Sequence, residues 1–202
     1  MHILSLACLQ NMYETKTFNI PELKGISKKT IDEHLKLYQG YVKHTNLILQ
    51  KMLDGAEGYE ESEARRRLGF EFNGMKNHEY YFEQLEGGPV KWSENATLTK
   101  KLTDQFGDGQ KAFEDFKKVA STRGIGWAIL YYDKTNAKLI QTWVDEQHLG
   151  QLNGLEFIFG LDMWEHSYML DYPPSEKMKY FEAYMDNVNW KVVEDRFVKA
   201  NK

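Results

Sequence analysis

The residues best suited to chemistry in this sequence are an aspartate and a histidine four positions apart. Asp162 and His166 follow the apolar run 155–161, which predicts a buried strand that ends at the aspartate. A carboxylate and an imidazole at the buried end of a strand can both ligate a transition metal. Two ligands do not hold a metal durably, so this pair predicts half of a metal site.

Two histidines in the first half of the chain can complete the site. His34 and His78 each lie near the apolar side of a segment with helical periodicity, so both are expected to point inward. Three imidazoles and one carboxylate suit iron, manganese or zinc, with a position left for water or substrate. A structural zinc site is normally richer in sulfur, and the one cysteine, Cys8, lies far from these residues in the sequence. The aromatic residues expected to keep bulk water away are Tyr41, Tyr81, Phe82, Trp127 and Trp164.

Two long helices and a small sheet are expected to position these ligands. The periodicity predicts a helix from the N-cap Ser27 to about Leu53 and a second from about Phe70 to Leu85. The charged segment 60–67 between them fits a solvated helix face or a loop. A boundary near residue 90 is expected to separate a helical hairpin domain, 1–90, from an α/β domain, 91–202. The second half is expected to contain helices over 97–106, 110–122, 175–187 and 190–200 and strands over 124–133, 139–144 and 155–162.

Composition and charge limit the class of protein. The chain has 202 residues, 42% of them hydrophobic and 28% charged, and a net charge of -4 with both signs interspersed. It has neither the basic stripe of a nucleic-acid binder nor the roughly 18 consecutive apolar residues of a membrane span, so neither partner is expected. The start lacks the basic leader of a secretory signal. A single cysteine cannot form an internal disulfide, which favours a reducing compartment, and we expect a cytoplasmic location.

Five motifs, in this order, resemble the iron/manganese superoxide dismutase family over most of the chain, from about Phe18 to the C-terminus. The motif at 162–166 is highly specific in combination with the one around His78. The motifs are His34 followed by Tyr41-Val42 and Asn46, Asn77-His78 followed by Tyr81-Phe82, Gly124-Ile125-Gly126-Trp127-Ala128, Asp162-Met163-Trp164-Glu165-His166, and Asn187-Val188-Asn189-Trp190.

The resemblance implies an α+β fold, with a long-helix hairpin followed by an α/β domain whose three-stranded antiparallel sheet is flanked by helices. It implies that one Mn or Fe ion per subunit lies between the two parts. The ligands implied by motif position are His34, His78, Asp162 and His166.

The resemblance also implies roles for residues around the metal. Tyr41 would lie at the mouth of the substrate funnel, and Tyr81, Trp127 and Trp164 would form an aromatic wall. Glu165 would reach across a dimer interface to the ligand histidine of a second subunit. The expected assembly is therefore a homodimer or a dimer of dimers.

The implied activity is disproportionation of superoxide, a small-molecule substrate, to dioxygen and hydrogen peroxide by redox cycling of the bound ion. The alternative is a catalytically weak member of the family that keeps the fold and the metal for a structural or metal-binding role.

One departure from the family concerns the first helix. The family usually separates the first ligand and the funnel tyrosine by eight positions, whereas His34 and Tyr41 are seven apart. At roughly 100° per residue, seven steps return to within about 20° of the start, and eight overshoot by about 80°. The longer spacing favours a one-residue π-bulge, so this sequence predicts a regular α-helix from His34 to Tyr41.

Two further departures concern proton delivery. The family's histidine–tyrosine pair across the interface is absent, since Tyr38 stands nearest to the histidine position and Met169 occupies the tyrosine position. We expect an aromatic and thioether contact there instead. The family's outer-sphere glutamine comes from one of two places, and Gly74 occupies the first, which favours manganese or a metal-tolerant enzyme. The donor is therefore expected from the loop after the second strand, with Gln147 favoured and His148 the alternative.

Overall fold

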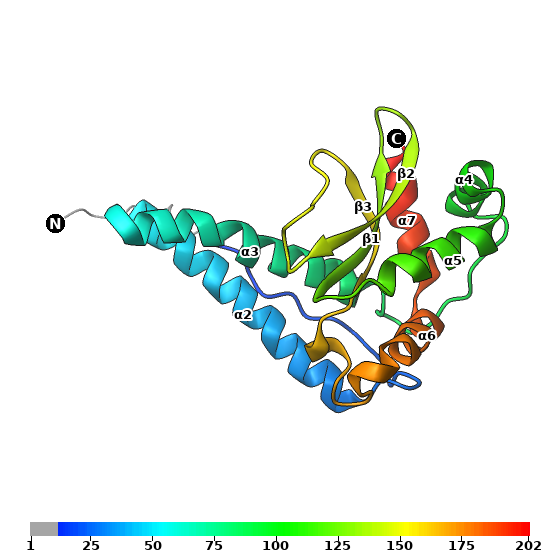
Figure 1. The fold of residues 1–202 in the computed structure, drawn as a ribbon, viewed down its shortest axis with the longest axis horizontal. Coiled ribbons are helices and arrows are strands. Elements are labelled where there is room, and N and C mark those ends of the chain that lie inside the picture. Colours follow the sequence, from blue (N-terminus) through cyan, green and yellow to red (C-terminus); the bar gives the residue numbers. More distant parts are fainter. Residues whose placement is uncertain (1–11) are drawn as a thin grey trace.

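Two long helices form the first half of the part of the chain that the computed structural model describes, residues 12–202. Helix α2 (Lys28–Leu53) and helix α3 (Gly58–Glu83) pack along each other as a hairpin (Figure 1). Ser27 is the N-cap of α2, and its side chain accepts a hydrogen bond from the Thr30 amide, as the sequence predicts. His2 and Cys8 lie outside the described residues.

Helix α2 is α-helical at every residue from Lys28 to Leu53 and contains no π-turn. This confirms the regular helix that the spacing of His34 and Tyr41 predicts. Both side chains therefore lie on nearly the same face of α2, and that face meets α3.

Helix α3 begins at Gly58, well before the start at Phe70 that the sequence predicts. The charged segment 60–67 is therefore a helix face and not a loop. Its ion pairs link residues three or four positions apart, Arg65 to Glu61 at 2.8 Å and Arg66 to Glu63 at 2.7 Å. Such pairs support a helix without an apolar stripe, which is why hydrophobic periodicity alone missed this start.

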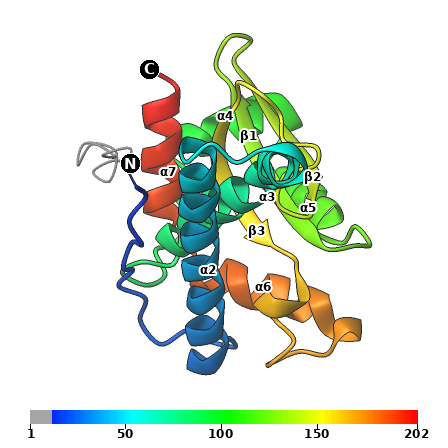
Figure 2. The ribbon, with the colours of Figure 1, turned by 90° about the vertical axis from the view of Figure 1, so that its left-hand side faces the viewer.

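The second half of the chain contains a small sheet with helices around it (Figures 1 and 2). The sheet is antiparallel, with strand order β2-β1-β3, which confirms the predicted fold class. Pairing of Trp127 with Asp162 places the start of β1 beside the end of β3. The elements are α4 (Thr97–Phe106), α5 (Gly109–Ala120), β1 (Gly126–Asp133), β2 (Lys138–Asp145), β3 (Glu156–Asp162), the short 3-10 helices η1 (Glu165–Ser167) and η2 (Pro174–Glu176), α6 (Lys177–Asn187) and α7 (Trp190–Ala200).

The helices cover the sheet in a way that brings the two halves of the chain together. Helix α5 packs against β1 and β2, and α7 packs against β3. Helix α3 also packs against β3, and α2 contacts η1. Both hairpin helices therefore reach the end of β3, where Asp162 lies.

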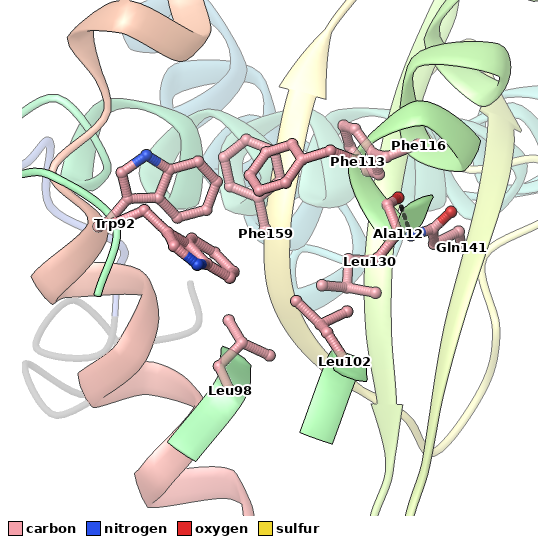
Figure 3. A pocket seen from close by; sticks show the side chains of 10 residues that line it. Trp92, Leu98, Leu102, Ala112, Phe113, Phe116, Leu130, Gln141 and Phe159 are labelled. Atoms are coloured by element: carbon pink, nitrogen blue, oxygen red, sulfur yellow. Dashed lines mark hydrogen bonds between the residues drawn. The ribbon is translucent and has the colours of Figure 1, made fainter. Parts of the chain in front are cut away.

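A small apolar cavity of about 20 Å³ lies between α4, α5, α7 and the sheet, and we call it the α4–α5 cavity (Figure 3). Its lining contains no titratable side chain, and Gln141 Nε2 donates to the Ala112 carbonyl at 2.9 Å. The lining residues are Trp92, Leu98, Leu102, Ala112, Phe113, Phe116, Leu130, Gln141, Phe159 and Trp190.

The segment around residue 90 joins the two halves. The Val90 amide donates to the Val188 carbonyl, and the Trp190 amide donates to the Val90 carbonyl, each at 3.2 Å. The division into domains at this point stays a prediction. Of the helices in residues 12–202, none combines the length and the apolar character that crossing a bilayer requires.

Candidate metal centre

Four side chains from four different elements meet where the hairpin touches the sheet. His34 comes from α2, His78 from α3, Asp162 from the end of β3 and His166 from η1. One ligand atom of each lies within 4.8 Å of the others. Asp162 Oδ2 lies 3.1 Å from His34 Nε2, 3.5 Å from His78 Nε2 and 3.0 Å from His166 Nε2. Three imidazole nitrogens thus converge on one carboxylate oxygen.

The donor atoms fit a bound transition metal. His34, His78 and Asp162 are fully buried, and the side chain of His166 is 20% exposed. His78 Nδ1 lies 2.6 Å from the Gly74 carbonyl, to which it donates, and this leaves the Nε2 lone pair directed at the cluster. That Nε2 is buried and finds no hydrogen-bond partner within residues 12–202. A nitrogen with a free lone pair beside a buried carboxylate is an arrangement that suits a transition metal such as Mn or Fe.

Burial and mutual contact set the charges of these groups. Burial lowers the pKa of His34 and lowers the pKa of His78 further, so both rings are neutral near pH 7. Burial alone would raise the pKa of Asp162, but the nearby imidazoles of His166 and His34 outweigh it and hold that pKa well below its ordinary value. The site therefore offers an anionic oxygen from Asp162 and neutral nitrogens from His34 and His78, the protonation states that metal binding needs.

A chain of hydrogen bonds runs beside the cluster from Trp127 to Tyr41. Trp127 Nε1 donates to Gln147 Oε1 at 2.8 Å, and Gln147 Nε2 donates to the Tyr41 hydroxyl at 3.0 Å. The rings of Tyr41 and Trp127 lie 5.0 and 5.1 Å from that of His78. Burial, followed by the charge of Asp162, raises the pKa of Tyr41, so its hydroxyl keeps its proton at neutral pH.

The backbone of Gln147 is held by residues that sequence reasoning missed. Asn77 Nδ2 and Gln151 Nε2 both donate to the Gln147 carbonyl at 3.2 Å. Gln151 also accepts a hydrogen bond from the Tyr131 hydroxyl. Asn77 stands in the motif beside His78, but Gln151 is a polar loop residue without any local pattern that could have identified it.

Two more aromatic side chains close the cluster. The ring of Tyr81 lies 4.8 Å from that of His34, and the Tyr81 hydroxyl hydrogen-bonds that of Tyr180 at 3.1 Å. The ring of Trp164 stacks on His166 at 5.6 Å, and its backbone amide donates to Asp162 Oδ1 at 2.8 Å. The cluster is thus bordered by rings, as expected for a site that excludes bulk water.

Gly74 leaves the space that the Tyr41 ring occupies. A Cβ at Gly74 would lie 2.5 Å from Tyr41 Cδ1, so a glutamine at this position cannot fit while Tyr41 stays in place. The amide beside the cluster comes instead from Gln147, on the loop after β2. The neighbouring His148 turns away, with its ring 5.7 Å from that of Phe70.

The expected contact of Tyr38 with a second subunit is wrong. Tyr38 is fully buried inside its own subunit, where its hydroxyl accepts a hydrogen bond from the Lys16 amide at 3.0 Å and lies 3.4 Å from Glu79. The preceding residue, Leu37, is the exposed one, at 41%. Because helical residues one apart differ by about 100° in direction, the sequence assigned the wrong neighbour to the surface. Met169 is 51% exposed, as an interface residue would be in an isolated subunit.

Glu165 does not reach the histidine beside it. Its side chain is exposed and forms no ion pair with any residue in 12–202. A contact with a ligand histidine would therefore have to come from another subunit.

Comparison with known proteins gives a consistent result. Residues 94–196 match the family model described as iron/manganese superoxide dismutases, C-terminal domain. The chain is 33% identical over 190 residues to the superoxide dismutase [Fe] of Aquifex aeolicus, covering 89% of this chain and 88% of that protein. It is 32% identical to the mitochondrial superoxide dismutase [Mn] of Glossina morsitans morsitans, covering 87% and 82%. It is 31% identical to the superoxide dismutase [Fe] of Pyrobaculum aerophilum, covering 94% and 96%.

The matches extend over both halves of the chain, including the hairpin that lies before the family model begins. They agree with the five sequence motifs and with the cluster of three histidines and one aspartate. The chain therefore belongs to the iron/manganese superoxide dismutase family.

Proposed function

We propose that this protein is a superoxide dismutase that holds one Mn or Fe ion per subunit through His34, His78, Asp162 and His166. The observation that carries the proposal is the convergence of three imidazole nitrogens on the buried Asp162 oxygen, in a chain of this family. Both iron and manganese enzymes are among its relatives. Superoxide is the proposed substrate, and dioxygen and hydrogen peroxide are the products.

What the ion supplies when bound is one-electron redox chemistry between its divalent and trivalent states. Two superoxide anions and two protons give one dioxygen and one hydrogen peroxide, so the protein must supply protons to a buried site. The Tyr41 hydroxyl and the Gln147 amide, hydrogen-bonded at 3.0 Å, are the proposed polar path beside the ligands. The rings of Trp127, Tyr81 and Trp164 exclude bulk water. Protons therefore arrive by way of the Tyr41 hydroxyl and the Gln147 amide.

Gly74 bears on which metal the protein uses. With no side chain there, the amide that tunes the site comes from the β2 loop, and this arrangement favours manganese or a metal-tolerant enzyme. Such outer contacts set the redox poise of a metal, and their loss costs about 10–100-fold in affinity or activity. Elemental analysis of the purified protein measures the preference directly.

Measurement of superoxide dismutation together with metal content tests the proposal. We expect about one Mn or Fe per subunit and dismutation that is lost when the metal is removed and restored when it is returned. Stoichiometric metal without dismutation would instead support the catalytically weak family member. The absence of the family's histidine–tyrosine pair supports that alternative, because Leu37 and Met169 are the exposed residues near those positions.

We further propose a homodimer, or a dimer of dimers, in which Glu165 contacts the ligand histidine of the other subunit. Support comes from the exposed Glu165 carboxylate beside the exposed apolar residues Met169 and Leu170. Light scattering on the wild type and on Glu165→Ala checks the assembly. A monomeric wild type with full activity would refute this part.

The cytoplasmic location also remains a proposal. It rests on the single cysteine of the sequence. A mitochondrial protein is among the relatives, so cell fractionation is the deciding measurement.

A further inference from the structure

Two buried aromatic side chains of β1 hydrogen-bond two glutamines of the loop that follows β2. Trp127 and Tyr131 are four residues apart on β1, so they point to the same face of the sheet and lie about 13 Å apart along the strand. Gln147 and Gln151 are also four residues apart. Trp127 Nε1 donates to Gln147 Oε1 at 2.8 Å, and the Tyr131 hydroxyl donates to Gln151 Oε1. The loop is therefore attached to the strand at two points.

Groups with only one hydrogen-bonding role fix the direction of both amides. The indole nitrogen of Trp127 can only donate, so Gln147 turns its oxygen to the indole and its Nε2 to the Tyr41 hydroxyl, 3.0 Å away. The backbone carbonyl of Gln147 can only accept, so Gln151 turns its Nε2 to that carbonyl, at 3.2 Å, and its oxygen to Tyr131. Burial raises the pKa of Tyr131, so its hydroxyl keeps its proton and remains a donor at neutral pH. Flipping either amide would place two donors or two acceptors against each other.

The main chain at Gln147 is held from two sides. Gln151 holds it from the loop, and Asn77 Nδ2 donates to the same carbonyl from α3 at 3.2 Å. Asn77 Oδ1 also accepts a hydrogen bond from Gln151 Nε2 at 3.3 Å. Asn77 and Gln147 are buried, and Asn77 directly precedes the ligand His78. These bonds join α3 to the loop and, through Tyr131, to β1.

The loop needs such attachment because it has little regular structure of its own. Residues 150–155 lie in neither a helix nor a strand, and the chain turns at Gly150, where φ is +91°. Side chains on loops are positioned less precisely than those on helices or strands. Hydrogen bonds to a strand residue as buried as Tyr131 give the loop the rigidity of the sheet.

We propose that Gln151 and Tyr131 are positioning residues that hold the Gln147 amide in place beside the metal ligands. This rests on the proposed function, in which that amide is part of the proton path. The hydrogen bonds of the Gln151 side chain go to Gln147, Asn77 and Tyr131. Gln151 therefore acts through Gln147 and not on the substrate.

The midpoint potential of the bound metal and the kinetic constants of dismutation test this role. We expect Gln151→Leu to lower kcat about three- to tenfold, less than the 10–100-fold typical of a direct outer contact, with KM within about twofold of the wild type. The potential should shift in the same direction as in Gln147→Leu and by a smaller amount, because the amide is displaced and not removed. A purely structural role of Gln151 would leave both the potential and kcat per folded subunit unchanged.

Tyr131→Phe isolates the attachment to β1, since it removes only a hydroxyl. It should shift the potential in the same direction as Gln151→Leu, and the double variant should match Gln151→Leu alone, because both residues act through one chain of bonds. Tyr132→Phe is the matched control. Tyr132 is the next residue of β1 and points to the other face, where its hydroxyl donates to Asn201. We expect this variant to behave as the wild type.

The indole N–H of Trp127 reports the position of Gln147 without turnover. Its hydrogen exchange can be followed by NMR in the protein loaded with Zn²⁺, which has no redox chemistry, and its resonance is identified by its loss in Trp127→Phe. We expect Gln151→Leu and Tyr131→Phe to speed this exchange at least about threefold, because a displaced amide releases the indole more often. Tyr132→Phe should leave the exchange rate unchanged.

Unchanged indole exchange and potential in Gln151→Leu would overturn the proposal, as would changes in Tyr132→Phe as large as those in Tyr131→Phe. Circular dichroism and metal content check that each variant folds. If Gln151→Leu fails to fold, Tyr131→Phe, which keeps the packed ring, decides alone. A wild type without dismutation would refute the proposed function, and the indole exchange would then decide whether Gln151 holds Gln147.

Discussion

The candidate metal centre and the α4–α5 cavity are both lined by packed aromatic rings, and they differ in one respect. In the cavity Trp190 lies 4.7 Å from Trp92 and 5.2 Å from Phe113, ring to ring. In the metal centre similar distances join His78 to Trp127 and His34 to Tyr81, 5.1 and 4.8 Å. The cavity is lined by apolar side chains, by Gln141 and by two tryptophans, and it contains no titratable group, whereas the centre contains four ligand atoms within 4.8 Å of one another.

The difference shows that aromatic packing alone does not mark a functional site. Buried rings stabilise both regions by the same dispersion and area burial. The metal centre is distinguished by polar atoms that cost free energy to bury and that are not all satisfied inside the protein, such as His78 Nε2. A bound cation would offset that cost, and the cavity has no comparable cost to offset.

The largest expected effect comes from removing a ligand. His78→Ala should lose stoichiometric metal and lower dismutation by more than the roughly 100-fold that loss of an outer contact costs. Elemental analysis and a dismutation assay measure both. His44→Ala is the control, since the His44 side chain is 54% exposed and is not part of the ligand cluster. Full metal occupancy in His78→Ala would contradict the distinction between the metal centre and the α4–α5 cavity, because metal binding would then not depend on the ligand atoms.

The converse change removes a ring from the cavity region. Phe116→Ala should lower the free energy of unfolding by about 3–5 kcal/mol, because Phe116 is buried and packs 5.2 Å from Phe159. Metal content per folded subunit should stay unchanged. Denaturant unfolding checks the first statement, and Tyr59→Ala, which alters a side chain that is 86% exposed, serves as control. Loss of metal from folded Phe116→Ala would show that the two regions are not independent.

A pair of glutamines, one in each region, makes a sharper test. Gln147→Leu should lower dismutation about 10–100-fold, because it removes the partner of both Tyr41 and Trp127. Gln141→Leu, which removes a hydrogen bond beside the cavity, should leave the activity within about twofold, since Gln141 acts on no group of the centre. The ratio of kcat/KM values measures the difference. Equal losses would assign the effect to stability and not to the site.

The smallest expected effect is the pH dependence of stability that the buried histidines His34 and His78 contribute. Burial lowers the pKa of His34 and of His78, so the unfolded chain binds more protons than the folded one below about pH 6.5. The stability of the metal-stripped protein should therefore fall as the pH drops below that value, by at most about 1.4 kcal/mol per pH unit for each histidine. Denaturant unfolding at pH 7.5 and 5.5 measures it. Phe116→Leu should show the same slope, and a stability that rises on acidification would contradict the assignment of neutral rings.

Local patterns were enough to predict the parts of the fold in which neighbouring residues cooperate. The start of α2 at Ser27, the course of α4 and the three strands follow from capping and periodicity. The start of α3 could not be predicted from these patterns, because its first turns carry ion pairs on an exposed face and no apolar stripe. The predicted direction of the Tyr38 side chain was wrong, since an error of one residue along a helix turns a side chain by about 100°.

The sequence by itself determined the chemistry that is available: three histidines and an aspartate of metal-binding type, a seven-residue interval that keeps α2 regular, and motifs that indicate the family. Only the tertiary structure decided which polar groups meet them. Gln147 faces Tyr41 because its backbone is held by Asn77, 70 positions away. Helix periodicity is a property of adjacent residues, whereas the direction of a loop side chain depends on contacts between distant segments.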